Sequence, residues 1–317
     1  MTQSPLNFQL RGTENPGMLH DWLSTTLSRH GHPTPDSRER VYPGAINRPQ
    51  TVPLQIGNLS CRATFYPERR AVQELARQEG ATSPLLAEFS GFGAKLRLIG
   101  RHVPYAAGHS LLIDPGVPQA VDEARLCLGL AVARALGPDW TFWLSIGGMT
   151  HNSFHIQMCR ETMPVTTAIL SQKATLCEKT NGADGAVRTG HLRGWLTNIN
   201  WIESEPPAVL ANAVVGECSA FCALGLTYDV TWRFDGRRVL VLVFKRRMAS
   251  IEALRTAPED IRRLGSIGAL ELGGWLLSVN DDADTFQGLA ADLRTFASLY
   301  RRALFHVALA ESEEALT

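Results

Sequence analysis

Apolar and polar residues alternate along several short stretches of the chain, and this period-two pattern predicts β-strands. We expect strands at residues 59–66, 94–101, 110–114, 141–146 and 155–161. Helical periodicity over residues 118–136 predicts a helix between the third and fourth of these strands, closed by Gly137 and Pro138. The central part of the chain is therefore predicted to run strand, helix, strand.

The second half of the chain has a similar mixture of patterns. We expect a strand at 191–201, a helix that Pro207 opens and that extends to about 224, a strand at 269–278 and a long helix at 284–310. The dipeptide Asp235-Gly236 predicts a tight hairpin between strands 228–234 and 239–244. No internal repeat is visible, and a distant duplication of two sheet-forming halves stays open. The pattern predicts an α+β fold, one antiparallel sheet flanked by helices.

The beginning of the chain differs in composition from the rest. Residues 1–50 are polar and interrupted by proline and glycine, with one amphipathic helix expected at 16–30. We interpret residues 1–50 as an arm or linker outside the sheet, and residues 51–317 as a single large domain.

Composition excludes several classes of protein. The chain has 317 residues, of which 44% are hydrophobic and 20% charged, as in ordinary soluble globular proteins. Lys and Arg together number 31, as do Asp and Glu, so no basic field is present to hold a nucleic acid. No apolar run approaches the roughly 20 residues that a membrane span needs. We therefore expect neither nucleic acid nor membrane as a partner, and any phosphate binding must be local.

Cysteine usage indicates the cytoplasm and argues against a metal site. Six cysteines are present without a CxxC pair, and no secretory signal segment precedes the domain. The closest pair, Cys218 and Cys222, has helical spacing in Ala-rich sequence, which is typical of buried small residues rather than of metal ligands. We expect reduced thiols, no structural zinc and no cofactor.

Candidate chemistry is concentrated in residues 147–157, Gly-Gly-Met-Thr-His-Asn-Ser-Phe-His-Ile-Gln. Strand geometry places Ser153, His155 and Gln157 on one face and turns the residues between them toward the core. A neutral imidazole is a good nucleophile toward phosphorus and then a good leaving group, so His155 can split one displacement into two. Gln157 can donate a hydrogen bond to a phosphate oxygen, and Gly147 and Gly148 would let backbone amides approach the phosphate closely.

A second segment strengthens this interpretation. Residues 101–114 contain a Pro-x-x-x-Gly-His sequence, from Pro104 to His109, that opens an apolar strand. Together with residues 147–157 and the helix between them, this arrangement resembles the histidine-triad (HIT) superfamily. The final Gln157 points to the branch of galactose-1-phosphate uridylyltransferase, dinucleoside-tetraphosphate phosphorylases and GDP-hexose phosphorylases, and the last of these are the most similar. Residues 65–69 and 271–274 are weaker echoes of the same family.

The resemblance implies an HIT-like fold over about residues 50–310 and a nucleotidyltransferase or phosphorylase. The substrate would be a nucleoside-diphosphate sugar or related dinucleotide, the acceptor phosphate or a phosphorylated molecule, and the intermediate a nucleotidyl-histidine. The oligomeric state, a homodimer included, stays open. The catalytic residues would be His155, Gln157 and Ser153, and the nucleotide-binding residues would be Gly147, Gly148, Asn152, Arg69 and His109. For His109, a structural hydrogen bond is favoured over a catalytic role.

Two departures from the family pattern open alternatives. Ser153 stands where the family has its first histidine, which helps to hold zinc in the metal-containing members, and Asp229 stands where the family has asparagine. A serine neither carries a positive charge nor binds metal comparably. One alternative is therefore a nucleotide-binding protein with lapsed chemistry, and another is a specialised biosynthetic enzyme that uses the pocket for an unrelated reaction.

Overall fold

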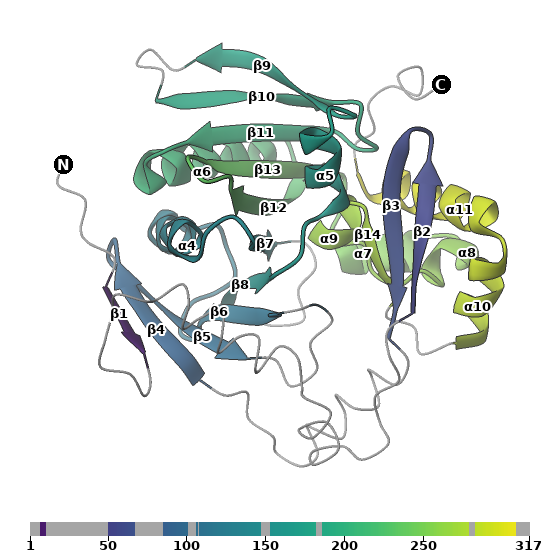
Figure 1. The fold of residues 1–317 in the computed structure, drawn as a ribbon, viewed down its shortest axis with the longest axis horizontal. Helices are drawn as coiled ribbons and strands as arrows, with labels where there is room; N and C mark the ends of the chain where they lie inside the picture. The colour runs from purple at the N-terminus through teal and green to yellow at the C-terminus, as the bar shows by residue number, and fades with distance from the viewer. Residues whose placement is uncertain are drawn as a thin grey trace.

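A large antiparallel sheet dominates the computed structural model, which describes residues 7–10, 50–66, 85–100, 106, 108–146, 153–181, 186–278 and 283–308. In this part of the chain eleven strands form the large sheet and three form a smaller one (Figure 1). Helices flank the sheet, so the expected α+β class is confirmed. No helix within the described ranges is long and apolar enough to cross a membrane.

The order of the strands shows a duplication that the sequence does not reveal. In spatial order the strands of the large sheet are β1 (Asn7–Leu10), β4 (Leu85–Gly91), β5 (Ala94–Gly100), β6 (Ser110–Asp114), β8 (Phe154–Cys159), β7 (Thr141–Ser145), β12 (Thr227–Phe234), β13 (Val239–Arg246), β11 (Ile199–Ser204), β10 (Val187–Arg193) and β9 (Thr175–Asn181). Each half, β4 to β8 and β9 to β13, consists of a three-stranded meander, then a helix, then a hairpin that returns to the sheet. In both halves the fifth strand lies beside the third, and the two fourth strands, β7 and β12, pair at the centre.

The pairing register relates the halves by a pseudo-two-fold axis. The last residue of the third strand pairs with the first residue of the fifth in both halves, Asp114 with Phe154 and Ser204 with Val239. At the centre of the sheet, Trp143 pairs with Thr231. When β8 and β13 are aligned from their first residues, each residue of β8 has an equivalent in β13.

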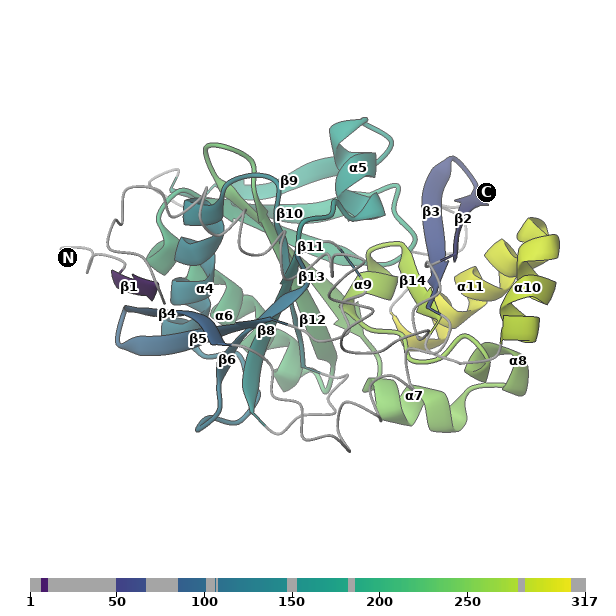
Figure 2. The same ribbon diagram turned by 60° about the horizontal axis from the view of Figure 1, so that its bottom comes forward.

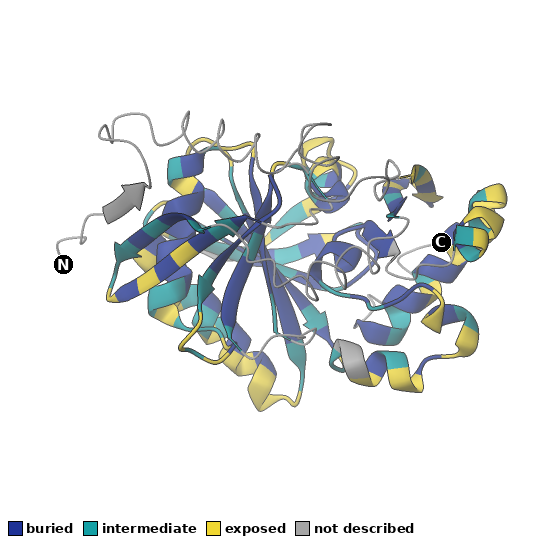
Figure 3. Ribbon diagram, turned by 90° about the horizontal axis from the view of Figure 1, so that it is seen from below, coloured by how far each residue is buried: buried dark blue, intermediate teal, exposed yellow. Residues whose placement is uncertain are grey.

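Two helices cover one face of the large sheet. They are α4 (Glu123–Leu136) and α6 (Pro207–Ala223), which lie side by side (Figure 2). The outer surface of α6 is exposed, whereas α4 is buried along residues 126–133 (Figure 3). Gly129 of α4 allows a close approach, because a Cβ there would lie 2.6 Å from the Ile156 side chain of β8. The alternation predicted for β8 is confirmed, since Phe154, Ile156 and Met158 pack beneath these helices.

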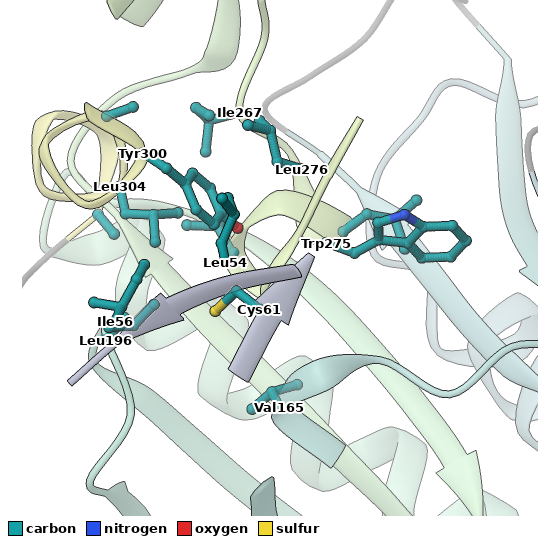
Figure 4. Packing of buried hydrophobic residues seen from close by; sticks show 14 of the residues in the cluster. Leu54, Ile56, Cys61, Val165, Leu196, Ile267, Trp275, Leu276, Tyr300 and Leu304 are labelled. Atoms are coloured by element: carbon teal, nitrogen blue, oxygen red, sulfur yellow. The ribbon is translucent and has the colours of Figure 1, made fainter. Parts of the chain in front are cut away.

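The other face carries a second layer that packs on part of the sheet (Figures 1 and 2). Its small sheet has the order β14 (Trp275–Ser278), β3 (Leu59–Phe65) and β2 (Gln50–Ile56), with β14 and β3 parallel. Its helices are α5 (Pro164–Leu170), α7 (Ser250–Thr256), α8 (Glu259–Arg262), α9 (Ala269–Leu272), α10 (Ala283–Ala291) and α11 (Leu293–Val307). Figure 4 shows residues from distant segments meeting in the core of this layer, including Leu54 of β2, Val165 of α5 and Tyr300 of α11.

Several predicted boundaries are wrong. The strand expected at 191–201 is two strands, β10 and β11, because the backbone of Gly194 (φ 80°) turns between them. The segment 269–278 is a helix followed by a strand. The helix expected at 284–310 is divided at Asp292, whose carboxylate caps α11 by accepting the amides of Arg294 and Thr295. The helix expected from 118 starts at Glu123.

The expected N-terminal arm is described only in part. Residues 7–10 form β1, which pairs with β4 at one edge of the large sheet, so this piece belongs to the sheet. The helix expected at 16–30 lies outside the described residues.

Glu271 of α9 is a buried carboxylate close to the end of β7. It accepts the backbone amides of Gly268 (2.8 Å) and Leu277 (3.3 Å). Burial raises the pKa of Glu271 to about 7, the nearby charge of Asp229 adds to this shift, and the backbone donors oppose it.

The raised pKa of Glu271 predicts how stability depends on pH. Because the folded state holds its proton more tightly than the unfolded state, the contribution is complete below pH 4.5 and is lost as pH rises through about 7. Glu271→Gln removes this titration. Relative to the variant, wild type should therefore lose up to about 3 kcal/mol of unfolding free energy between pH 4.5 and pH 8. Denaturant unfolding of both proteins at several pH values measures it, and a constant difference would contradict the prediction.

Candidate active site

His155 lies on β8, with its side chain on the face opposite α4 and α6. It is buried, with 8% of its surface exposed, and it pairs with Ile113 of β6. Gln157 follows on the same face, as expected from the period of the strand. The sheet therefore brings these two predicted residues together.

The backbone defines which nitrogen of His155 can react. Its Nδ1 lies 3.0 Å from the carbonyl oxygen of Ser153. A carbonyl oxygen can only accept, so Nδ1 must donate its proton, and the lone pair of the neutral ring is then on Nε2. Ser153 thus contributes to the site through its backbone, a role that does not depend on a histidine side chain at this position.

Gln119 fixes the backbone of His155 from both sides. Its Oε1 accepts the amide of His155 (2.6 Å), and its Nε2 donates to the carbonyl oxygens of His155 (3.1 Å) and Ser145 (3.3 Å). The pairing of β7 with β8 runs from Thr141 to Trp143, so the side-chain amide of Gln119 bridges the two strands just beyond it. The sequence analysis missed Gln119, because no local pattern marks a contact across 36 residues.

Gln157 is oriented by His109. The Nε2 atom of His109 lies 3.3 Å from Oε1 of Gln157, which can only accept, so the ring donates and the amide group of Gln157 points elsewhere. The imidazole also stacks on Trp143, with ring centroids 5.9 Å apart. The neighbouring Gly108 lets the backbone take this path, because its φ is 66° and a Cβ there would lie 2.7 Å from the Trp140 ring. His109 therefore contacts a candidate catalytic side chain, Gln157.

Asp229 lies inside the protein, beside the end of β7. Its carboxylate has no exposed surface, accepts the amide of Ile146 (3.2 Å) and forms an ion pair with the buried Arg246. Both partners belong to the protein itself, so Asp229 supports the backbone at Ile146, just before residue 147.

Four predicted residues cannot be placed. Gly147, Gly148, Asn152 and Arg69 lie outside the described residues. Across the described ranges, no three His, Cys, Asp or Glu side chains are arranged to hold a metal ion.

Comparisons with known proteins identify the fold but not a family. No family model matches the chain, and a search of curated proteins found no match. Crystal structures of yeast Ap4A phosphorylase Apa2 are similar, at 14% sequence identity and covering 92% of this chain. The TM-score is 0.60 for one crystal structure of that enzyme, 0.61 for its complex with AMP and 0.58 for its complex with Ap4A, with 95%, 98% and 98% of that chain covered. The expected HIT-like fold is thereby confirmed, and this chain has the same fold as an Ap4A phosphorylase.

Proposed function

We propose that this protein is a nucleotidyltransferase that moves a nucleoside monophosphate through a covalent intermediate on His155. The observation that supports this most directly is the hydrogen bond from Nδ1 of His155 to the carbonyl oxygen of Ser153. It directs the reactive lone pair to Nε2, the atom that must attack phosphorus.

The reaction has two balanced steps. Nε2 of His155 attacks the α-phosphorus, a P–N bond forms, and the P–O bond to the leaving phosphate breaks. An oxygen of the acceptor phosphate then attacks the same phosphorus, and the P–N bond breaks to regenerate the imidazole. Gln157, held through its carbonyl oxygen by His109, donates its amide protons to the negative charge that develops on the phosphoryl oxygens. No cofactor takes part.

We propose a nucleoside-diphosphate sugar or a related dinucleotide as the substrate, with phosphate or a phosphorylated molecule as the acceptor. A nucleotide at this site is supported by the similar fold of Ap4A phosphorylase Apa2. Crystal structures of that enzyme include complexes with AMP and with Ap4A. The GDP-hexose phosphorylase motif favours a sugar as the second group. The six free cysteines are consistent with a cytoplasmic location.

A nucleotide-binding protein with lapsed chemistry is the second candidate. Ser153 supports it, because this position lacks the imidazole of the family pattern. In that case nucleotide would bind without the P–N bond. The two candidates therefore differ in one measurable product, the covalent adduct.

Replacing His155 tests the nucleophile. His155→Ala should abolish both the adduct and turnover while the fold is retained, because the attacking nitrogen is removed with little core volume. Gln157→Ala should slow turnover on the order of tenfold to a thousandfold, since one phosphate hydrogen bond is lost. Intact-protein mass spectrometry after incubation with a panel of nucleotide sugars and Ap4A measures the adduct, and His191→Ala, a half-buried histidine of β10, is the control.

The outcomes separate the candidates. Turnover at the wild-type rate in His155→Ala would refute the mechanism. Nucleotide binding by wild type without any adduct would favour the lapsed enzyme.

Gln119 is predicted to act as a positioning residue. Gln119→Ala removes the hydrogen bonds that fix the backbone of His155, so kcat should fall on the order of tenfold to a hundredfold with KM little changed. The ¹⁵N chemical shifts of the His155 ring should show a less uniform tautomer. Gln55→Ala, at an exposed glutamine of β2, is the control. A change in KM alone would contradict this role.

A further inference from the structure

A pocket lies on the same face of the large sheet as His155, but in the other half. Its floor is formed by β7, β12 and β13, and α5 covers it. The pocket has a volume of about 150 Å³. Its walls are mainly apolar, with Leu240 and Leu242 on the floor and Ile169 and Leu170 on α5. Leu170 is 70% exposed, which is unusual for a large apolar side chain.

The pseudo-two-fold axis shows which position this pocket occupies. Leu240 is the second residue of β13, as His155 is of β8, and Leu242 corresponds in the same way to Gln157. Thr231, which also lines the pocket, pairs directly with Trp143 across the centre of the sheet. The pocket is therefore the second-half counterpart of the candidate active site. With leucines in place of the imidazole and the amide, it can bind a molecule but has no nucleophile at this position.

Arg233 gives the pocket a positive charge. Its guanidinium is half-buried and donates one hydrogen bond to Thr162 Oγ1 (2.7 Å). Burial lowers the pKa of Arg233, and the charge of Asp139 opposes this shift. A guanidinium nevertheless stays protonated in proteins.

The cation has no ion-pair partner among the described residues. Asp139 is ion-paired with Arg160 (3.4 Å), and Asp235 at the rim accepts the amides of its own turn (2.8 and 2.7 Å). A partly desolvated guanidinium in apolar surroundings is a strong site for a carboxylate, which can accept two parallel hydrogen bonds from it.

We propose that this pocket binds a small organic carboxylate whose apolar body packs on Leu240, Leu242 and α5 and whose charge pairs with Arg233. A cavity of about 150 Å³ accepts a molecule the size of benzene. The ligand is thus one ring or one branched chain carrying a single carboxylate. A small-molecule site is usually a mainly apolar pocket with a small number of polar groups.

Titration calorimetry with benzoate and 3-methylbutanoate, against neutral benzamide as the uncharged isostere, tests the proposal. Wild type should bind the carboxylates and bind benzamide at least tenfold more weakly. Arg233→Met should weaken carboxylate binding at least tenfold and remove the preference over benzamide. Thr166→Phe, which fills the pocket from α5, should abolish binding of all three. Arg97→Gln, at an exposed arginine of β5, is the matched control and should bind as wild type does.

The test is independent of the proposed catalysis, because it needs no nucleotide. His155→Ala should bind the carboxylates as wild type does, whether or not this residue is a nucleophile. Loss of carboxylate binding in His155→Ala, with binding retained in Arg233→Met and Thr166→Phe, would place the anion in the other half and overturn the proposal. Absence of carboxylate binding to wild type would also overturn it. If Arg233→Met fails to fold, Arg233→Lys, which keeps the charge, and Thr166→Phe still decide the result.

Discussion

The ion pair of Asp229 and Arg246 has no exposed surface, and the alignment of the elements around the site depends on it. The second oxygen of Asp229 accepts the amide of Ile146 at the end of β7, while Nε of Arg246 donates to the carbonyl of Met248 (3.3 Å). Burying two charges costs several kcal/mol, and removing one partner leaves the other charge uncompensated. The pair is therefore tolerated only in the arrangement that satisfies it, which aligns β7, β12 and β13 beside Ile146.

Duplication of one folding unit explains how the sheet can carry a candidate active site in one half and a separate pocket in the other. Both halves have the same strand order and the same pairing register, so each fifth strand presents its second and fourth residues to the same face. In β8 these residues are polar and form the candidate site. In β13 they are leucines, and Leu242 belongs to the core beneath the second layer. One frame thus carries the candidate site in one half and a mainly apolar pocket beneath α5 in the other.

The chemical state of His155 is determined mainly by groups that are not themselves reactive. A backbone carbonyl at Ser153 selects the tautomer, and the amide of Gln119 fixes the strand. His109 likewise acts on Gln157, holding its oxygen so that its amide protons are directed away. Such groups keep their orientation during a reaction, which is the basis of electrostatic preorganisation. At position 153 the contact with His155 is made by the backbone carbonyl and not by the serine side chain.

What the sequence determined by itself is local. The hairpin at Asp235-Gly236 and the alternation of β8 follow from neighbouring residues, because turn chemistry and strand period act over a few positions. The division of the last helix at Asp292 was not predicted, because the amphipathic pattern continues through it. The tertiary structure alone decided the duplication, the contact of Gln119 with His155 and the buried partner of Asp229. Each of these joins residues that are far apart in the chain, and their partners become definite only when the strands pair and exclude water.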